Sequence, residues 1–384
     1  MSGGSLLQTP FDAMHRAAGA KMGAFAGYDM PIQYQAGVMK EHLHTRTAAG
    51  LFDVSHMGQA ILRTKTEAIG TPDAHQAVSA ALETLAPAEY QRLKRGRLRY
   101  SVLLNDAGGI MDDFITTRFP SQESDGELFL VVNAGSKQND FSHIADKLAD
   151  QTSLEVLSDR VLLALQGPEA ARVIGDIFPD ADKQPFMSMS TAGWRGAEVY
   201  VSRCGYTGED GFEVSLPASV GNEFAEHLLS DTKVEWIGLG ARDSLRLEAG
   251  LCLYGHDLSP ETSPVEGAIE FSIGKRRREE GGFPGADRVL AELTSGAKTR
   301  RVGILPDGRA PVREGAVIHD ASDTAIGVVT SGGFGPSMER PVAMGYVSAS
   351  HAEIGREIKV IVRGKSLPAK VVDMPFVPHQ YFRG

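Results

Sequence analysis

The chain has 384 residues, of which 42% are hydrophobic and 23% charged, and this composition excludes collagen-like, disordered and low-complexity proteins. Its 39 basic and 49 acidic residues give a net charge of −10, so binding of nucleic acid through phosphate neutralisation is not expected. Two cysteines, Cys204 and Cys252, are too few for a disulfide framework and are typical of a reducing compartment.

The chain also lacks the patterns of membrane insertion and export. We find no run of about 18 consecutive apolar residues, so no membrane span is expected. The N-terminus has neither the basic and apolar regions of a secretory signal nor the arginine-rich pattern of a mitochondrial transit peptide. These features predict the cytoplasm for a bacterial chain, or the mitochondrial matrix for a eukaryotic one.

The first 285 residues mix helical and strand periodicities, which predicts an α+β region. The turn Asn-Asp-Ala-Gly-Gly at 105–109 joins two strand patterns and predicts a hairpin. The predicted strands lie at 51–54, 59–63, 100–104, 110–119, 128–132, 162–166, 199–203 and 212–216, and the predicted helices at 37–47, 140–149, 169–177, 223–229 and 239–249.

The pattern changes near residue 285. Residues 278–285 are polar and glycine-rich, which predicts a linker, and short apolar runs separated by glycine and proline follow at 302–305, 325–330, 343–347, 358–362 and 369–372. Such runs are typical of a small antiparallel β-barrel or sandwich. We therefore divide the chain into an α+β region at 1–285 and an all-β region at 286–384.

The predicted hairpin ends in two adjacent carboxylates, Asp112 and Asp113. Because strand side chains alternate between faces, only one of the two can face a given pocket unless the strand bulges. An aspartate inside an apolar strand is costly if it has no partner. The pair therefore marks either a functional site or a turn in which an aspartate binds backbone amides.

Two further positions indicate binding of a polar ligand. Glu213 lies in a predicted strand, and a carboxylate accepts two parallel N–H bonds of the kind that a 2-amino-4-oxopyrimidine ring presents. Arg242 and Arg246 are four residues apart on one helical face. An arginine on a partly apolar face needs an anion, which is either Glu248 or a carboxylate of the substrate.

Basic clusters and histidines complete the candidates. The clusters at 275–278 (KRRR) and 94–99 (KRGRLR) are either solvated surface or docking sites for an acidic protein or a polyanionic ligand. His42, His44 and His56 have no carboxylate or cysteine at metal-ligand spacing, so we expect no metal. We find no P-loop, GxSxG or dinucleotide-binding pattern.

Eight ordered blocks of the chain resemble the aminomethyltransferase, or T-protein, family of the glycine cleavage system. They are TPFDAMHRAAGAKMGAFAGYDMPIQY at 9–34, HLHTRTAAGLFDVSHM at 42–57, NDAGGIMDD at 105–113, LALQGP at 163–168, RCGYTGEDGFE at 203–213, ARDSLRLEAGLCLYGHD at 241–257, PVEGAIEFSIGKRRR at 264–278 and MPFVPHQYF at 374–382.

The resemblance implies a three-domain cloverleaf, with two mixed α/β domains forming a folate-binding region and a C-terminal antiparallel β-barrel. It implies transfer of the methylene carbon of an aminomethyl group, carried on the lipoyl arm of H protein, to tetrahydrofolate. The products would be 5,10-methylenetetrahydrofolate, ammonia and dihydrolipoyl H protein. Tetrahydrofolate is then a substrate, and neither a metal nor a flavin is expected.

The resemblance also implies roles for individual residues. It gives the catalytic role to Asp112, acting through orientation and electrostatics. The folate-binding positions that it implies are Glu213, Arg242 and Tyr381, with Met57, Tyr100 and Asn133 lining the folate channel. From their charge we hypothesise that the two basic clusters, at 275–278 and 94–99, dock an acidic H protein.

Three alternatives share the fold. The folate domain of dimethylglycine or sarcosine oxidase accompanies a flavin domain, for which this chain has neither room nor motif. A folate-binding assembly factor for iron–sulfur enzymes carries a KGCYxGQE-type motif, where this chain has RCGYTGEDGFE at 203–213. A folate-dependent O-demethylase shares most of the pocket, and the blocks at 241–278 favour the glycine-cleavage enzyme over it.

Overall fold

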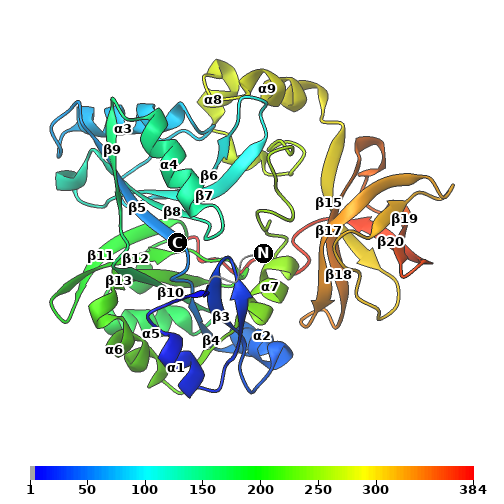
Figure 1. The fold of residues 1–384 in the computed structure, drawn as a ribbon, viewed down its shortest axis with the longest axis horizontal. Coiled ribbons are helices and arrows are strands. Elements are labelled where there is room, and N and C mark those ends of the chain that lie inside the picture. The colour runs from blue at the N-terminus through cyan, green and yellow to red at the C-terminus, as the bar shows by residue number, and fades with distance from the viewer. Residues whose placement is uncertain (1–4) are drawn as a thin grey trace.

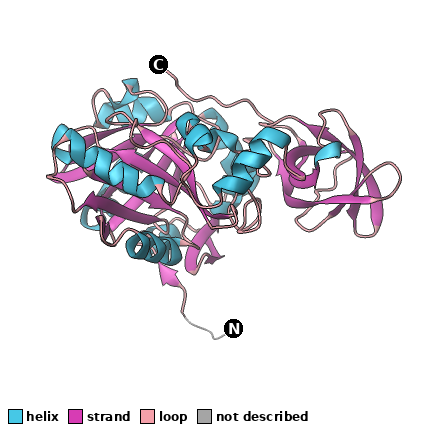
Figure 2. Ribbon diagram, turned by 90° about the horizontal axis from the view of Figure 1, so that it is seen from above, coloured by secondary structure: helices cyan, strands magenta, loops and turns pink. Residues whose placement is uncertain are grey.

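The computed structural model describes residues 5–384, which form three lobes around a common centre (Figure 1). Two lobes are mixed α/β and the third is a β-barrel. Figure 2 shows the C-terminal tail leaving the barrel and crossing back to the α/β lobes. Within residues 5–384 no helix is both long and apolar enough to cross a bilayer.

The first lobe is a five-stranded antiparallel sheet in the order β6-β7-β8-β5-β9. Its strands are β5 (Gly58–Thr64), β6 (Leu98–Leu104), β7 (Ile110–Arg118), β8 (Glu127–Val132) and β9 (Thr152–Val156). Two helices, α3 (Pro72–Glu83) and α4 (Lys137–Lys147), bury their apolar sides against one face of this sheet. Burial of this face is the main stabilising term for the lobe, because apolar area removed from water dominates folding.

The second lobe is a six-stranded sheet in the order β11-β12-β13-β10-β4-β14, covered on its outer face by three helices. Its elements are α1 (Asp12–Ala17), β4 (Ala49–Asp53), β10 (Arg160–Gln166), α5 (Ala170–Ile177), β11 (Ser188–Trp194), β12 (Ala197–Arg203), β13 (Gly211–Pro217), α6 (Ala218–Leu229) and β14 (Val234–Trp236). The inner faces of the two sheets share a core that includes Phe52, Phe129, Ala164 and Tyr200.

Smaller elements connect the lobes. A three-stranded sheet contains β1 (Leu7–Gln8), β2 (Lys21–Phe25) and β3 (Tyr28–Gln33), and the helices α2 (Val38–Thr47) and α7 (Leu239–Glu248) contact one another. Short 3-10 turns are η1 (Gln122–Ser124), η2 (Ala181–Lys183), η3 (Glu270–Ser272) and η4 (Ala349–His351), and α8 (Lys275–Glu280) and α9 (Ala286–Ser295) precede the barrel.

The third lobe is a closed antiparallel barrel in the order β15-β18-β17-β16-β19-β20. Its strands are β15 (Thr299–Pro306), β16 (Val317–His319), β17 (Ala325–Gly335), β18 (Arg340–Ser348), β19 (Glu357–Val362) and β20 (Lys365–Val372). Closure pairs every strand on both sides and leaves no open sheet edge. The structure thus confirms the predicted mixed α/β body with a C-terminal barrel.

Two local predictions around residue 285 are wrong. Residues 275–280, which overlap the predicted linker, form the helix α8, and residues 286–295, inside the region assigned as all-β, form the helix α9. Val289 of α9 is buried in one core with Ile110 of the hairpin. The apolar side chains of α9 therefore pack against the first lobe. The strands of the barrel begin only at Thr299.

Candidate active site

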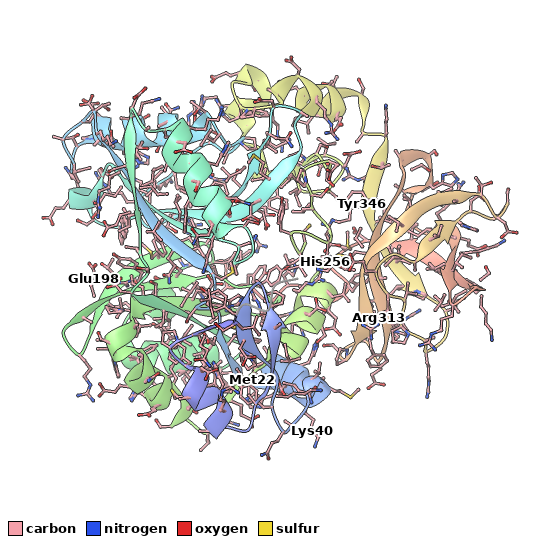
Figure 3. All side chains as sticks on the ribbon, viewed as in Figure 1. Met22, Lys40, Glu198, His256, Arg313 and Tyr346 are labelled. Carbon is pink, nitrogen blue, oxygen red and sulfur yellow. The ribbon has the colours of Figure 1, made fainter. Side chains whose placement is uncertain are left out.

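A cavity of about 1410 Å³ lies where the three lobes meet. Its wall takes residues from both α/β lobes, from α7, from the barrel strands β15 and β20 and from the C-terminal tail. His256, labelled near the junction of the lobes in Figure 3, is one of these wall residues. The six residues predicted to bind folate all line this cavity: Met57, Tyr100, Asn133, Glu213, Arg242 and Tyr381.

The predicted catalytic residue, Asp112, does not line the cavity. Its side chain is 0% exposed, whereas the neighbouring Asp113 lies on the cavity wall. In β7 the residues Ile110, Asp112 and Phe114 are all buried, so Asp112 shares the core-facing side of the strand. Strand alternation then puts Asp113 on the opposite side. The structure thus places the second carboxylate of the pair at the site, and not the first.

Asn133, just after β8, connects the two carboxylates. Its Nδ2 atom lies 2.9 Å from Asp112 Oδ1 and 2.8 Å from Asp113 Oδ1, and it also donates to the Asp113 carbonyl at 3.0 Å. The Asn133 backbone N–H donates to Asp112 Oδ2 at 3.2 Å. One amide group therefore fixes the position of the carboxylate on the wall relative to the one behind it.

The carboxyl groups in this cluster have raised pKa values. Burial and the negative charge of Asp140 raise the pKa of Asp112 to about 9, against the opposing effect of hydrogen bonds from Asn133. Burial and the charge of Asp112 raise the pKa of Asp113 to about 7, while hydrogen bonds from Tyr100 and Asn133 oppose the rise. Like charges this close do not all ionise together. Near pH 7 Asp112 is therefore protonated, and Asp113 exchanges between its protonated and its ionised form.

Glu213 and Arg242 form a second polar part of the wall. Burial raises the pKa of the Glu213 carboxyl, while the charge of Arg242 and the Cys204 thiol lower it. The Arg242 guanidinium lies 4.6 Å from the centroid of the Tyr206 ring, and burial lowers its pKa. Among residues 5–384 no carboxylate lies within ion-pair distance of Arg242. Its positive charge therefore remains available to a ligand.

Arg246, one helical turn after Arg242 in α7, is paired with carboxylates of the protein. Arg246 Nη1 donates to Asp257 at 2.9 Å, and its Nε donates to Asp243 at 2.8 Å. Glu248, one of the two predicted anions for these arginines, forms a hydrogen bond or ion pair with neither of them within residues 5–384. Only Arg242 of this pair therefore faces the cavity as an uncompensated cation.

The C-terminal tail completes the wall. The ring of Tyr381 stacks on Phe186 with centroids 3.9 Å apart and an interplanar angle of 4°. The backbone N–H of Gln380 donates to the carbonyl of Gly208 at 2.8 Å, and that of Phe186 donates to Phe382 at 2.7 Å. These bonds hold an aromatic surface against the second lobe.

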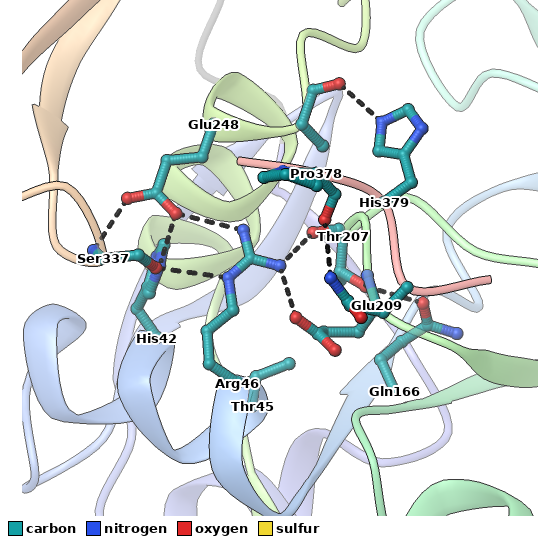
Figure 4. A network of polar contacts seen from close by, with 12 residues as sticks. His42, Thr45, Arg46, Gln166, Thr207, Glu209, Glu248, Ser337, Pro378 and His379 are labelled. Carbon is teal, nitrogen blue, oxygen red and sulfur yellow. Dashed lines mark hydrogen bonds and ion pairs between the residues drawn. The ribbon is translucent and has the colours of Figure 1, made fainter. Parts of the chain in front are cut away.

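A buried polar network fixes the barrel to the α/β body beside the site (Figure 4). Arg46 of α2 pairs with Glu248 of α7 at 3.1 Å and with Glu209 at 3.0 Å. Glu248 also lies 3.0 Å from His42 Nε2 and accepts from the backbone N–H of Ser337, in the turn between β17 and β18, at 2.8 Å.

The part of the chain described here, residues 5–384, contains no cluster of His, Cys, Asp and Glu side chains suited to a metal.

The two basic clusters have different environments. In the cluster at 275–278, Arg276 pairs with Glu83 and Glu280, and Arg277 is buried and donates to main-chain carbonyls. These two side chains stabilise the fold, whereas Lys275 and Arg278 are exposed, and docking of H protein at this cluster stays a prediction. In the cluster at 94–99, Arg95 pairs with Asp125, while Lys94, Arg97 and Arg99 line the cavity.

Comparison with known proteins decides the family. Residues 11–277 match the GCVT N-terminal domain, and residues 299–378 match the glycine cleavage T-protein C-terminal barrel domain. The chain belongs to the glycine cleavage T-protein family. It is 42% identical to the mitochondrial aminomethyltransferase of Homo sapiens over 98% of this chain and 91% of that protein. The corresponding protein of Dictyostelium discoideum is 41% identical over 99% and 94%.

A solved structure agrees with this assignment. The glycine cleavage system aminomethyltransferase T from Bartonella henselae superposes with a TM-score of 0.90 at 44% identity, covering 98% of this chain and 100% of that one. The chain is therefore an enzyme with the aminomethyltransferase activity of this family. The family uses tetrahydrofolate, and the predicted family resemblance is confirmed.

Several residues of the site were not predicted. Tyr206 and Phe186 lie far in sequence from the side chains they contact, Arg242 and Tyr381. Asp113 belongs to the hairpin motif at 105–113 but is not among the site residues predicted from the sequence. Local alternation gives no signal for this choice, because Asp112 shares its face of β7 with Ile110 and Phe114 while Asp113 shares the other with Met111 and Ile115.

Proposed function

We propose that the central cavity binds tetrahydrofolate and receives the aminomethyl group from the lipoyl arm of H protein. The observation that carries this proposal is the convergence of all six predicted folate-binding residues, together with Asp113, on one cavity. A volume of about 1410 Å³ exceeds the roughly 300–1,000 Å³ of ordinary small-molecule sites. It has room for a folate and for the end of a second substrate.

The polar groups of the wall fit the chemistry of a folate. Glu213 presents two acceptor oxygens, which suits the paired N–H donors of a 2-amino-4-oxopyrimidine ring. Arg242 supplies a positive charge without a protein partner, which suits an anionic or carbonyl group. Tyr381 and Phe186 add an aromatic surface, since flat rings pack well on aromatic faces.

The transfer requires the movement of two protons. The carbon–sulfur bond and the carbon–nitrogen bond of the aminomethyl group break, and two bonds from its carbon to folate nitrogens form. Two N–H protons of the folate are released, of which one goes to the lipoyl sulfur and the other to the departing ammonia. A carboxyl group whose pKa is about 7, as for Asp113, is suited to accept and return a proton at neutral pH.

The charge of Asp113 has a second effect. The carbon being transferred gains positive charge as ammonia leaves, and a fixed carboxylate in a dry cavity stabilises such charge strongly. We therefore assign the catalytic role to Asp113. Asp112 acts as a positioning residue through Asn133, which bonds both carboxylates.

The rim of the cavity next to the barrel offers an entry for the lipoyl arm. Phe271 is 67% exposed and Ile354 is 64% exposed, and both line the cavity. The Phe271 ring lies 5.6 Å from that of Tyr100. Exposed apolar surface at the mouth of a site suits an apolar partner, and most of the length of the lipoyl arm is methylene groups. We place the entry of the arm at this rim.

The test is a turnover assay with purified protein and aminomethylated lipoyl H protein, in the presence and absence of tetrahydrofolate. The proposal predicts that ammonia and 5,10-methylenetetrahydrofolate form together and only when folate is present. Folate binding without either product would overturn the proposed transfer and would favour the demethylase or assembly-factor alternatives.

A further inference from the structure

The C-terminal tail, residues 373–384, reaches the second lobe without a helix or strand of its own. Figure 2 shows this segment crossing from the barrel to the α/β lobes. Near its end, the backbone N–H of Gln380 donates to the carbonyl of Gly208 at 2.8 Å. The carbonyl of Phe382 accepts from the backbone N–H of Phe186 at 2.7 Å. The end of a chain stays ordered only where contacts of this kind hold it.

The side chain of Phe382 makes a further contact with the second lobe. The guanidinium of Arg203, the last residue of β12, lies 4.3 Å from the centroid of the Phe382 ring and 5.1 Å from that of Phe212. Phe212 is buried, whereas Phe382 is 41% exposed. A cation over an aromatic face is attracted by the ring. One guanidinium therefore contacts both a ring of the core and a ring of the tail.

Bonds within the second lobe hold Arg203 in place. Its Nε donates to Asp210 Oδ1 at 3.0 Å and its Nη2 donates to the other oxygen of that carboxylate. Its Nη1 donates to the carbonyl of Gln184 at 2.8 Å. A bidentate pair with a carboxylate fixes the plane of a guanidinium group. Phe382 therefore binds a cation whose position is set by other parts of the lobe.

Phe382 follows directly after Tyr381, which is proposed above to contact folate. Tyr381 lines the cavity, and its ring stacks on Phe186 with centroids 3.9 Å apart. Phe382 itself does not line the cavity. Consecutive Cα atoms are only about 3.8 Å apart, so a fixed Phe382 leaves the backbone of Tyr381 little freedom. The contact with Arg203 thus bears directly on where the Tyr381 ring lies.

We propose that Phe382 is a positioning residue, whose ring on the Arg203 guanidinium fixes the tail so that Tyr381 lies on the folate wall of the cavity. This inference rests on the proposed function, since Tyr381 must contact a folate. Phe382 touches no reacting atom. Its loss should therefore weaken folate binding and leave the transfer step itself unchanged.

The test uses Phe382→Ala in the full-length protein with two measurements. The first is amide hydrogen exchange of the tail, which needs no substrate. The second is the Kd for tetrahydrofolate from titration calorimetry, together with kcat at saturating folate and H protein. Since the Phe382 ring is 41% exposed, its removal should leave the fold intact.

Three further variants serve as controls. Phe382→Trp keeps an aromatic face for the guanidinium, whereas Phe382→Leu keeps apolar bulk without that face. Gln380→Ala changes an exposed side chain of the same tail, which donates to the carbonyl of Pro378 within the tail itself. It leaves the backbone N–H of residue 380 in place, so it is the matched control.

In Phe382→Ala we expect the amide of Gln380 to exchange about tenfold faster, because the tail opens locally more often. The Kd for tetrahydrofolate should rise about three- to tenfold, since a cation–π contact of a partly exposed ring is modest. The value of kcat at saturation should stay within about twofold of wild type, as for loss of uniform binding. Phe382→Trp should restore both the exchange rate and the Kd, Phe382→Leu should restore neither fully, and Gln380→Ala should match wild type.

Three results would overturn the inference. They are wild-type exchange in Phe382→Ala, faster exchange with an unchanged Kd, and full rescue by Phe382→Leu, which would remove the cation–π contact from the account. A wild-type protein that binds no tetrahydrofolate would contradict the proposed function, and the positioning role with it. The exchange rates would still show in that case whether Phe382 holds the tail, so the two failures are distinguishable.

Discussion

The side-chain amide of Asn133 donates to Asp113 at 2.8 Å and to the carbonyl of the same residue at 3.0 Å. These two bonds fix both the carboxylate and the backbone of Asp113. Because the same amide also bonds the buried Asp112 at 2.9 Å, Asn133 links the carboxylate on the cavity wall to Asp112, which does not line the cavity. The first two predictions test this relationship.

The first prediction concerns Asp112. Since its raised pKa keeps it protonated near neutral pH, Asp112→Asn replaces one neutral acceptor by another, and we expect kcat within about threefold of wild type. Asp112→Ala leaves the backbone N–H of Asn133 without its partner and removes one acceptor of its side-chain amide, which costs roughly 1–3 kcal/mol, and we expect a much lower kcat. Steady-state turnover with H protein measures both. Equal losses in the two variants would show that the charge of Asp112 is required.

The second prediction concerns pH. Hydrogen bonds from Asn133 favour the ionised form of Asp113 and so lower its pKa. Asn133→Ala removes them, so the pKa should rise above about 7 and the activity that needs ionised Asp113 should appear at higher pH. The measurement is the pH dependence of kcat. Asn222→Ala, at an exposed site, is the control, and an unshifted profile in Asn133→Ala would contradict the assignment.

Glu213 provides a third prediction. Glu213→Gln puts an N–H group where an acceptor oxygen should face the pyrimidine ring, so a paired hydrogen bond is lost and a repulsive contact replaces it. We expect the Kd for tetrahydrofolate to rise at least tenfold, as titration calorimetry would measure. Glu223→Gln, an exposed residue that pairs with Arg195, should leave the Kd unchanged. Unaltered folate affinity in Glu213→Gln would remove the pyrimidine contact from the proposal.

The apolar rim leads to a fourth prediction. Phe271→Ala removes a ring that is 67% exposed, so the stability of the fold should change little. If the lipoyl arm enters there, the KM for H protein should rise several-fold while the KM for tetrahydrofolate stays the same. Val328→Ala, an exposed apolar residue of the barrel, is the matched control. Loss of folate affinity without an effect on H protein would place the entry elsewhere.

A fifth prediction concerns stability. Burial would raise the pKa of Glu248, but hydrogen bonds from His42 and Ser337 and the charge of Arg46 lower it to about 2. The network therefore contributes stability above the ordinary pKa of a glutamate, and this contribution is lost as the pH falls toward 2. Arg46→Met leaves the buried Glu209 without its ion-pair partner and leaves Glu248 only its bonds to His42 and Ser337, so it should cost about 3–5 kcal/mol. Urea unfolding measures the change in the free energy of unfolding, and a change below about 1 kcal/mol would contradict it.

The sequence predicts most strands, the hairpin turn and the barrel because each depends on local periodicity and turn residues. It also indicates that Asp112 and Asp113 face opposite ways. Which of the two faces the cavity depends on which side of β7 packs under α3 and α4. That is a long-range contact, and local pattern alone does not contain it.

The ion-pair partners of buried charged residues likewise depend on long-range contacts that the local sequence pattern does not contain. Glu248 is one of the two anions that the sequence offers to an arginine of its own helix, the other being a substrate carboxylate, but it pairs with Arg46 and His42 of α2. Similarly, the basic run at 275–278 forms a helix, and an i,i+4 pair between Arg276 and Glu280 supports it. That spacing was visible in the sequence, whereas the second partner, Glu83, comes from another part of the chain.

The most direct test of the central claim is a single-turnover measurement on Asp113→Asn with aminomethylated lipoyl H protein and tetrahydrofolate. A positioned acid–base group contributes roughly 10²–10⁴-fold, so we predict a loss of that order in the rate at which ammonia and 5,10-methylenetetrahydrofolate form. Folate affinity should stay near that of wild type. A rate within a few-fold of wild type in Asp113→Asn, with a large loss in Asp112→Asn, would contradict the assignment and return the catalytic role to Asp112.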